Sequence, residues 1–323
     1  MRVSIVRLTL VVGIGLPGAV LAQQAPALSP QEALAVLQRI ANAARQLSYT
    51  GTFVYQQGDL VETSRIAHVN ESGHEIERLE TLDGPRREIY RKDDQVVVIN
   101  PETRAMRVDR RRPGRFFPQI LPDQLANVVD NYHVRRGEVE RIASHDAQVL
   151  VLEPKDDKRY GHRFWADVGT GLLLKAKMIG DRNTVVEHFA FTQVQIGPVP
   201  RDALQPPPGI SEPPPAAPPE KVAEASWEVR QAPSGFRKVV EVKRSRDGSG
   251  GSVITHLVLT DGLTTISVFI EPGRAGGDAE RSVQKGSVNI YTKVVDGYRV
   301  TVVGEAPAVT VQSIATSVSL KSK

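Results

Sequence analysis

The spacing of apolar residues predicts an amphipathic helix near the start of the chain. Ser29-Pro30-Gln31-Glu32 puts Ser at an N-cap, Pro at the first helical position and Glu three residues after the cap, which is a capping-box arrangement. Apolar residues then recur at intervals of three and four, as on one helix face; they are Ala33, Leu34, Leu37, Ile40, Ala41, Ala44 and Leu47. The sequence therefore predicts a helix that begins at Pro30 and buries this stripe.

Beyond Leu47 the period changes to two, which is typical of strands. Tyr49 to Tyr55 alternate, with Phe53 and Tyr55 on one face. Further strand-like runs follow, separated by Gly, Asn, Asp and Pro; they are Leu60–Val69, Glu75–Leu82, Arg87–Arg91, Gln95–Ile99, Ala105–Val108, Val134–Ala143, Gln148–Leu152, His162–Ala166, Leu172–Met178 and Val185–Val194. Pro122 to Val129 predicts a short helix. Successive strands with short turns favour an antiparallel sheet that curls toward a barrel.

The last hundred residues repeat this logic on a smaller scale. Strands are predicted at Arg237–Lys243, Val253–Leu259, Thr264–Glu271, Val288–Lys293 and Tyr298–Val303. A helix is predicted after Pro307, where Val311, Ile314, Ala315 and Val318 form one stripe that can cover a sheet face. The fold class is therefore mainly β (α+β), with a larger and a smaller antiparallel sheet and no internal repeat between them.

A proline-rich segment separates the two sheets. Eight of the 22 prolines fall between Gln205 and Pro219, and such a run favours extended polyproline II over a helix or central strand. A ligand for a proline-recognition domain is the alternative, but a semi-rigid linker is the simpler interpretation. We expect a first domain at residues 23–200, a linker at 201–220 and a second domain at 221–323.

Residues 1–22 have the pattern of a secretory signal peptide. Arg2 and Arg7 precede a short apolar run that ends at Pro17, and Ala22 offers a small residue at the expected cleavage site. The run is far shorter than the roughly 20 apolar residues that a membrane span needs. Gly13, Gly15 and Gly18 have dinucleotide-binding spacing, but no strand precedes them and we interpret the match as chance. The predicted location is therefore the periplasm.

Composition narrows the function classes. The 323 residues contain no Cys, which excludes disulfides, thiolate metal sites and a thiol nucleophile and leaves no acceptor for a lipid anchor. The net charge of +4 is too small to indicate nucleic-acid binding. G-x-S-x-G, H-E-x-x-H and P-loop motifs are absent, and the seven His are scattered. The run from Asp156 to Arg159 has the composition of a solvated, self-paired loop. We expect no cofactor, no metal and no catalytic residues; an enzyme would need a polar cleft with a perturbed titratable group.

One basic segment is the sharpest candidate site. Six arginines and one acid fall within twelve residues, followed by two phenylalanines; the candidates are Arg104, Arg107, Arg110, Arg111, Arg112, Arg115, Phe116 and Phe117. The first domain as a whole has 24 basic and 24 acidic residues. Arginine forks suit phosphates and carboxylates, so the segment is a candidate contact for an anionic glycolipid or acidic peptide. The alternative is a solvated loop whose Phe116 and Phe117 pack in the core.

Several stretches of the chain resemble the MucB/RseB family, periplasmic negative regulators of the sigma-E-type envelope stress response. The similar stretches span both domains in order; they are Tyr49–Tyr55, Arg65–His68, Glu77–Leu79, Leu82–Pro85, Arg159–Arg163, Gly169–Leu174, Leu259–Leu263, Ser267–Pro272, Val295–Val300 and Val302–Glu305. Each is weak alone and together they are specific.

The resemblance implies a fold and partners that composition does not show. The first domain would be an unclosed antiparallel barrel of the lipoprotein-carrier (LolA-like) type with a lipid-sized concavity. The protein would bind the periplasmic domain of a transmembrane anti-sigma factor, shield it from regulated proteolysis, and release it when envelope lipid such as lipopolysaccharide binds. The alternative is a lipid or lipoprotein carrier that uses the same concavity. A homo-oligomer is also compatible with the sequence.

Overall fold

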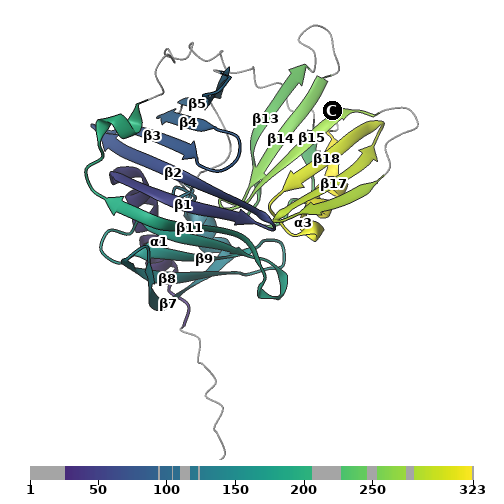
Figure 1. Cartoon of the computed structure of the whole chain (residues 1–323). Coiled ribbons are helices and arrows are strands. Elements are labelled where there is room, and N and C mark those ends of the chain that lie inside the picture. Colours follow the sequence, from purple (N-terminus) through teal and green to yellow (C-terminus); the bar gives the residue numbers. More distant parts are fainter. Residues whose placement is uncertain are drawn as a thin grey trace, which may run out of the picture.

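The computed structural model describes residues 26–93, 95–103, 105–109, 117–122, 124–205, 227–245, 253–273 and 280–321. These residues form a larger antiparallel sheet in the first part of the chain and a smaller one in the second (Figure 1). Helices are few. The predicted fold class, mainly β with a large unclosed sheet and a smaller sheet plus helix, is confirmed.

The larger sheet has eleven strands, β1 Tyr49–Gln57, β2 Leu60–Glu71, β3 His74–Thr81, β4 Glu88–Lys92, β5 Gln95–Asn100, β6 Ala105–Asp109, β7 Tyr132–Ile142, β8 His145–Pro154, β9 Gly161–Asp167, β10 Leu173–Ile179 and β11 Val185–Ile196. Every neighbouring pair is also adjacent in sequence except β1 and β11, which pair from Tyr49 opposite Ile196. The two runs of strands therefore spread from this central pair. Strands β6 and β7 end up at opposite edges, so the sheet stays unclosed.

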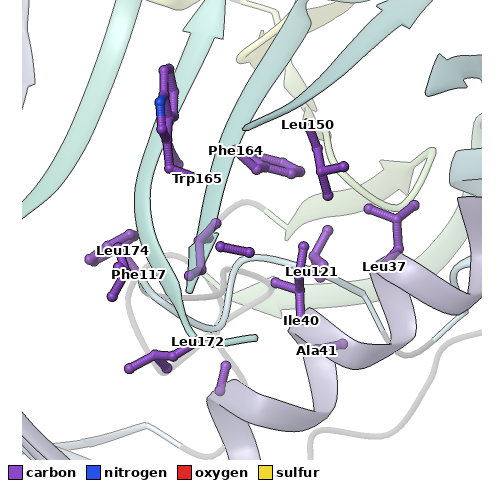
Figure 2. Close-up of a cluster of buried hydrophobic side chains, with 14 of the residues drawn as sticks. Leu37, Ile40, Ala41, Phe117, Leu121, Leu150, Phe164, Trp165, Leu172 and Leu174 are labelled. Atoms are coloured by element: carbon purple, nitrogen blue, oxygen red, sulfur yellow. The ribbon is translucent and has the colours of Figure 1, made fainter. Parts of the chain in front are cut away.

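Helix α1 (Pro30–Gln46) packs against this sheet and carries its predicted cap. The Ser29 backbone N–H donates to Glu32 Oε2 at 2.9 Å, and the Glu32 N–H donates to Ser29 Oγ at 3.3 Å. Figure 2 shows Leu37, Ile40 and Ala41 pointing from α1 into the cluster of buried side chains. The prediction is wrong for Leu34, which is 40% exposed, because the helix rests on the sheet with a narrower face than the stripe suggests.

The smaller sheet has six strands, β13 Arg237–Ser245, β14 Val253–Thr260, β15 Thr265–Pro272, β16 Arg281–Lys285, β17 Val288–Val295 and β18 Tyr298–Gly304, in the order β13-β14-β15-β18-β17-β16. Helix α3 (Ala308–Ser317) covers one face. Three residues of its predicted stripe, Val311, Ile314 and Ala315, are buried on the helix at 0% exposure. The prediction is wrong for Val318, which is buried at 3% exposure but begins a strand directly after the helix. Strand β16 and the pair β12 (Trp227–Val229) and β19 (Val318–Leu320) were not predicted. They are short or polar, so their sequences carry little alternation.

The remaining elements are short. Helix α2 (Ala126–Asn131) begins four residues later than predicted, and the 3-10 helices η1 (Asp181–Asn183) and η2 (Arg201–Leu204) complete the first part. Helix η2 lies at the start of the predicted linker, and the Tyr90 hydroxyl donates to the Gln205 carbonyl at 3.1 Å. Residues 206–226, with the proline run, and residues 1–25, with the predicted signal peptide, lie outside the described residues.

Candidate ligand cavity between the two domains

A cavity of about 820 Å³ lies between the two sheets. Strands β1, β2, β9, β10 and β11 supply one wall, and strands β13, β14, β15 and β18 of the smaller sheet supply the other. Ligand sites in proteins commonly measure about 300–1,000 Å³ and combine an apolar lining with a few polar groups. The cavity between the domains has the size of such a site.

The deep part of the first wall is aromatic. Phe53 of β1 and Phe189 of β11 line the cavity together with Phe117, whose ring stacks on Phe189 with centroids 5.5 Å apart. Phe53 lies 5.2 Å from Phe117 by ring centroids. Phe164 and Met178 extend this surface across β9 and β10. This aromatic part of the wall, which we call the cavity floor, therefore suits an acyl chain or the apolar side chains of a peptide.

A polar row crosses the same wall. His162 of β9 is the register partner of Met178 of β10, which is the partner of Glu187 of β11. Register partners in an antiparallel sheet point to the same face, and all three residues line the cavity. His162 is 6% exposed, and its Nε2 has no hydrogen-bond partner among the described residues. Burial lowers the pKa of His162 to about 4, so the ring is neutral at pH 7.

The second wall is a matching row on the smaller sheet. Val258 of β14 pairs with Ser267 of β15, which pairs with Val303 of β18, and all three line the cavity. The alternating residues on the other face, such as Leu257 and Val268, are fully buried. One face of the smaller sheet is therefore covered by α3, and the other face lines the cavity.

Glu187 of the first domain and Glu305 of the second form a pair of carboxyl groups in this cavity. Burial and, to a smaller extent, the charge of the nearby Glu305 together raise the pKa of Glu187 to about 8. Burial likewise raises the pKa of Glu305. The Tyr55 hydroxyl of β1 hydrogen-bonds to Glu187. We call Glu187 and Glu305 the carboxyl pair. At pH 7 Glu187, with a pKa of about 8, is therefore mainly protonated, because two like charges in a partly buried site resist ionising together.

The basic residues that line the cavity are engaged elsewhere. Arg87 forms an ion pair with Glu62 at 3.3 Å. Arg237 donates to the Gln124 side chain. Lys177 lies over the Trp165 ring, 5.9 Å from its centroid. Among the described ion pairs, none joins a basic residue to the carboxyl pair.

The domain boundary also contains a compensated cluster of charges. Arg159 donates to both carboxylate oxygens of Asp156 at 2.9 Å and, across the boundary, to Asp261 Oδ2 at 2.8 Å. The side chains of Arg159 and Asp261 are both 0% exposed. Although burial opposes it, hydrogen bonding to Asp156 and the charge of Asp261 raise the pKa of Arg159. We call Asp156, Arg159 and Asp261 the clasp.

The clasp corrects one sequence interpretation. Asp157 and Lys158 do form an exposed pair, at 2.8 Å. The prediction of a solvated, self-paired loop is wrong for Arg159, because its partner Asp261 lies about a hundred residues later in the chain. Nearby, the Asn289 side chain donates to the Tyr160 hydroxyl at 3.1 Å and Thr310 Oγ1 donates to the Lys158 carbonyl at 2.8 Å.

The sequence-predicted basic segment falls largely outside the described residues. Those outside are Arg104, Arg110, Arg111, Arg112, Arg115 and Phe116. Arg107 lies on β6, where only its backbone is described. Phe117 is 1% exposed, packs in the core and borders the cavity floor. The structure brings none of the other candidates to the cavity within the part that it describes.

Sequence reasoning missed the polar groups of the cavity. Glu187 alternates with Phe189 and Phe191 on the inward face of β11, so an acid in an apolar register was a usable signal. His162 occupies the same kind of position on β9. Glu305 follows the end of β18, where no local pattern indicates which way it faces.

Two further features of the described residues concern metal binding and membrane spans. Within the described ranges, no group of His, Asp and Glu is placed to hold a metal ion. The described helices include none with the length and hydrophobicity of a membrane span.

Comparisons with known proteins cover both domains. Residues 32–209 match the model of the MucB/RseB N-terminal domain, and residues 221–319 match that of the MucB/RseB C-terminal domain. The chain is similar to the sigma factor AlgU regulatory protein MucB of Pseudomonas aeruginosa, with 35% identity over 91% of this chain and 92% of that protein. It is 22% identical to the sigma-E factor regulatory protein RseB of Escherichia coli over 88% of this chain and 89% of that protein.

Solved structures give the same result. A crystal structure of MucB in complex with MucA(peri) matches with a TM-score of 0.75 and 29% identity, covering 90% of this chain and 100% of that one. A crystal structure of MucB matches with a TM-score of 0.65 and 31% identity, covering 90% of this chain and 98% of that one.

Proposed function

The chain belongs to the MucB/RseB family, and we propose that it is a periplasmic sigma-factor regulator that binds the periplasmic domain of a transmembrane anti-sigma factor. The observation that carries the proposal is the match of both domains, in order, to a regulator whose solved structure is a complex with MucA(peri). The signal-peptide pattern of residues 1–22 supports export to that compartment.

The cavity between the domains is the proposed site for a segment of the partner. Its volume of about 820 Å³ holds a few side chains and not a folded domain, so the partner would insert a short stretch of chain. Phenylalanine rings of the first domain would take the apolar side chains of that stretch. Strand β13 is an edge of the smaller sheet, and Val239 on it lines the cavity and is 46% exposed. An edge of this kind supports strand addition by an extended peptide.

Bound in this way, the regulator would shield the anti-sigma factor from regulated proteolysis. Envelope lipid would act as the release signal, since an acyl chain and an apolar peptide segment would compete for the same floor. Two ligands that compete for one cavity, or that favour different arrangements of the two domains, each weaken the binding of the other by thermodynamic linkage. A linker rich in proline would let the domains change their relative pose.

A binding measurement with a blocked cavity tests the proposal. The chain of residues 23–323 is titrated with the purified periplasmic domain of its anti-sigma factor, and MucA(peri) serves as a reference ligand. Ser267→Trp fills the cavity from the second wall and should weaken binding at least tenfold. Ser282→Trp makes the same change on β16, where Ser282 is exposed, and should bind normally. Absence of binding at micromolar concentration for the unaltered chain would reject the proposed function.

A lipid or lipoprotein carrier is the second candidate, favoured by the aromatic floor. Extraction of co-purified lipid, followed by transfer assays between vesicles, separates the two functions. A carrier delivers lipid catalytically without the anti-sigma domain, whereas a sensor binds the domain and loses it when lipid is added. A perturbed carboxyl in a cavity is also a feature of acid–base enzymes, but the relatives are regulatory proteins, which supports a binding role.

The basic segment Arg104–Phe117 remains a proposed contact for anionic lipid headgroups. The triple variant Arg110→Ala/Arg111→Ala/Arg112→Ala should weaken binding to vesicles that contain anionic glycolipid, and the loss should be largest at low salt, where charges are least screened. Unchanged vesicle binding would reject this role.

A further inference from the structure

The carboxyl pair is an unusual feature for a cavity wall. One acid comes from each domain, both line the same cavity, and the basic residues described in its lining, Arg87, Lys177 and Arg237, each contact another group. The titratable groups that interact with the pair are Tyr55 and Tyr160; Glu62 acts electrostatically on Tyr55, and Asp181 acts on Tyr160. All of these groups are neutral or acidic. Two carboxyl groups without a basic partner among the described ion pairs make a site that attracts cations.

A second observation in the same cavity also points to a ligand. His162 lies in the row with Met178 and Glu187, is 94% buried by its 6% exposure, and leaves Nε2 without a hydrogen bond to any described residue. Buried polar atoms are nearly always satisfied in folded proteins. An orphan nitrogen two strands from Glu187 indicates that a bound molecule supplies the missing partner.

We propose that Glu187 and Glu305 form a receptor for one basic side chain, lysine or arginine, of the segment that the partner inserts between the domains, with His162 hydrogen-bonding to the backbone of that segment. The inference rests on the proposed function for the identity of the ligand as a peptide. The positive charge of the bound side chain would lie between one carboxyl group from each domain, so the bound cation would also hold the domains together.

The chemistry of the pair explains why a cation fits better than a neutral group. Without a ligand the pair retains about one proton, because burial and mutual repulsion raise the pKa of Glu187 to about 8. A guanidinium or ammonium group compensates both charges and displaces that proton. Binding near neutral pH should therefore release about one proton for each cation bound.

A small probe tests the receptor apart from the anti-sigma factor. The chain of residues 23–323 is titrated with n-hexylguanidinium and with 1-hexanol, which has the same apolar tail and no charge. We expect hexylguanidinium to bind at least tenfold more tightly at pH 7.5. The double variant Glu187→Gln/Glu305→Gln should remove this advantage and leave hexanol binding unchanged. Glu138→Gln is the matched control, because that acid is exposed on β7 and lies outside the cavity lining, and it should retain the preference.

Proton release gives a readout that a loss of fold would not imitate. Calorimetry of hexylguanidinium binding in two buffers of different ionisation enthalpy should show about one proton released. The affinity should rise about tenfold per pH unit from pH 5.5 to 7.5, below the Glu187 pKa, and level off above pH 8. His162, with its pKa near 4, stays neutral across this range. Equal binding of the two probes, or an unchanged preference in the double variant, would overturn the receptor.

Titration with the anti-sigma domain separates the two proposals. If the probe binds as expected and the domain does not bind at all, the proposed function fails and the cation site stands. If the domain binds equally well to the chain and to the double Gln variant, the function stands and the receptor is wrong. If both proposals hold, the double variant should bind the anti-sigma domain at least tenfold more weakly than the unaltered chain. Single substitutions of the partner's basic residues should then identify the one that enters the site.

Discussion

The clasp and the carboxyl pair both bury charge between the domains, but they treat it differently. In the clasp, Arg159 makes three hydrogen bonds of 2.8–2.9 Å with Asp156 and Asp261, so every buried charge has a partner of opposite sign. In the pair, Glu187 and Glu305 have the same sign, and a proton suppresses one charge. The clasp is complete within the protein, whereas the pair is completed only by something added.

This difference assigns the two regions different roles. Removing one partner of a buried, satisfied ion pair strands the other charge and is strongly destabilising. Removing one member of a like-charged pair relieves repulsion instead. The clasp is therefore a structural contact between the domains, and the pair is a site held at some cost in stability, as binding sites often are.

The largest expected effect comes from breaking the clasp. Arg159→Ala leaves Asp261 buried without its partner and should lower the free energy of unfolding by about 3–5 kcal/mol. It also removes the cation–π contacts of the guanidinium with Phe236 at 5.3 Å and Tyr132 at 5.9 Å. Urea denaturation followed by tryptophan fluorescence measures the loss, since each domain contains one tryptophan, Trp165 in the first and Trp227 in the second.

Lys158→Ala is the matched control for the clasp. Lys158 is the neighbouring residue, and its ion pair with Asp157 is exposed, so its removal should cost less than about 1 kcal/mol. Similar losses for Arg159→Ala and Lys158→Ala would show that the clasp contributes no more than a surface ion pair.

The carboxyl pair should make the free energy of unfolding decrease as pH rises toward 8. The folded-state pKa of Glu187, about 8, lies above its ordinary value of 4.5, so the folded protein binds more protons than the unfolded chain between these values. Stability is therefore lost as pH rises through this window. From pH 6.5 to 8 the loss should be on the order of 2 kcal/mol, at about 1.4 kcal/mol for each pKa unit.

Buried histidines produce the opposite dependence in a separate range. The pKa values of His68 and His162 are both lowered from 6.5 to about 4 by burial, so stability falls as pH drops below 6.5 toward 4. Urea midpoints measured between pH 6.5 and 8 therefore report on the carboxyl pair. Glu187→Gln should flatten that slope, and Glu138→Gln, at an exposed site on β7, should leave it intact. A slope that persists in Glu187→Gln would assign the pH dependence to another group.

The same contrast explains what the sequence could and could not predict. Local patterns predicted the capping box at Ser29, the helix after Pro307 and most strands, because each of these depends on neighbours within a few residues. Successive strands with short turns predicted an antiparallel sheet that curls toward a barrel, and the family resemblance implied that the barrel is unclosed. The β1–β11 pairing joins Tyr49 to Ile196, and no local signal carries that information.

The site was less predictable than the fold. The clasp joins Arg159 to Asp261 and the pair joins Glu187 to Glu305, so each depends on how two separate domains meet. The run from Asp156 to Arg159 has the composition of a surface loop, and Arg159 is a buried contact only because the fold places Asp261 beside it. An arginine-rich segment attracts notice by its density, whereas single acids in apolar registers, such as Glu187, carry a weaker signal that alternation along β11 makes visible.

The smallest expected effect concerns Tyr160, which lies between the two regions. It follows Arg159 in the chain, accepts a hydrogen bond from Asn289 at 3.1 Å, and interacts electrostatically with Glu305. Tyr160→Phe removes one hydrogen bond across the boundary and should lower the free energy of unfolding by about 1 kcal/mol, since Asn289 keeps its 2.8 Å bond to the Ala306 carbonyl. Tyr298→Phe, away from the boundary, is the control. If Tyr160 belongs with the clasp, its loss should be the same at pH 6.5 and pH 8. A loss that grows with pH would place Tyr160 with the carboxyl pair, because its hydroxyl would then be stabilising the ionised form of Glu305.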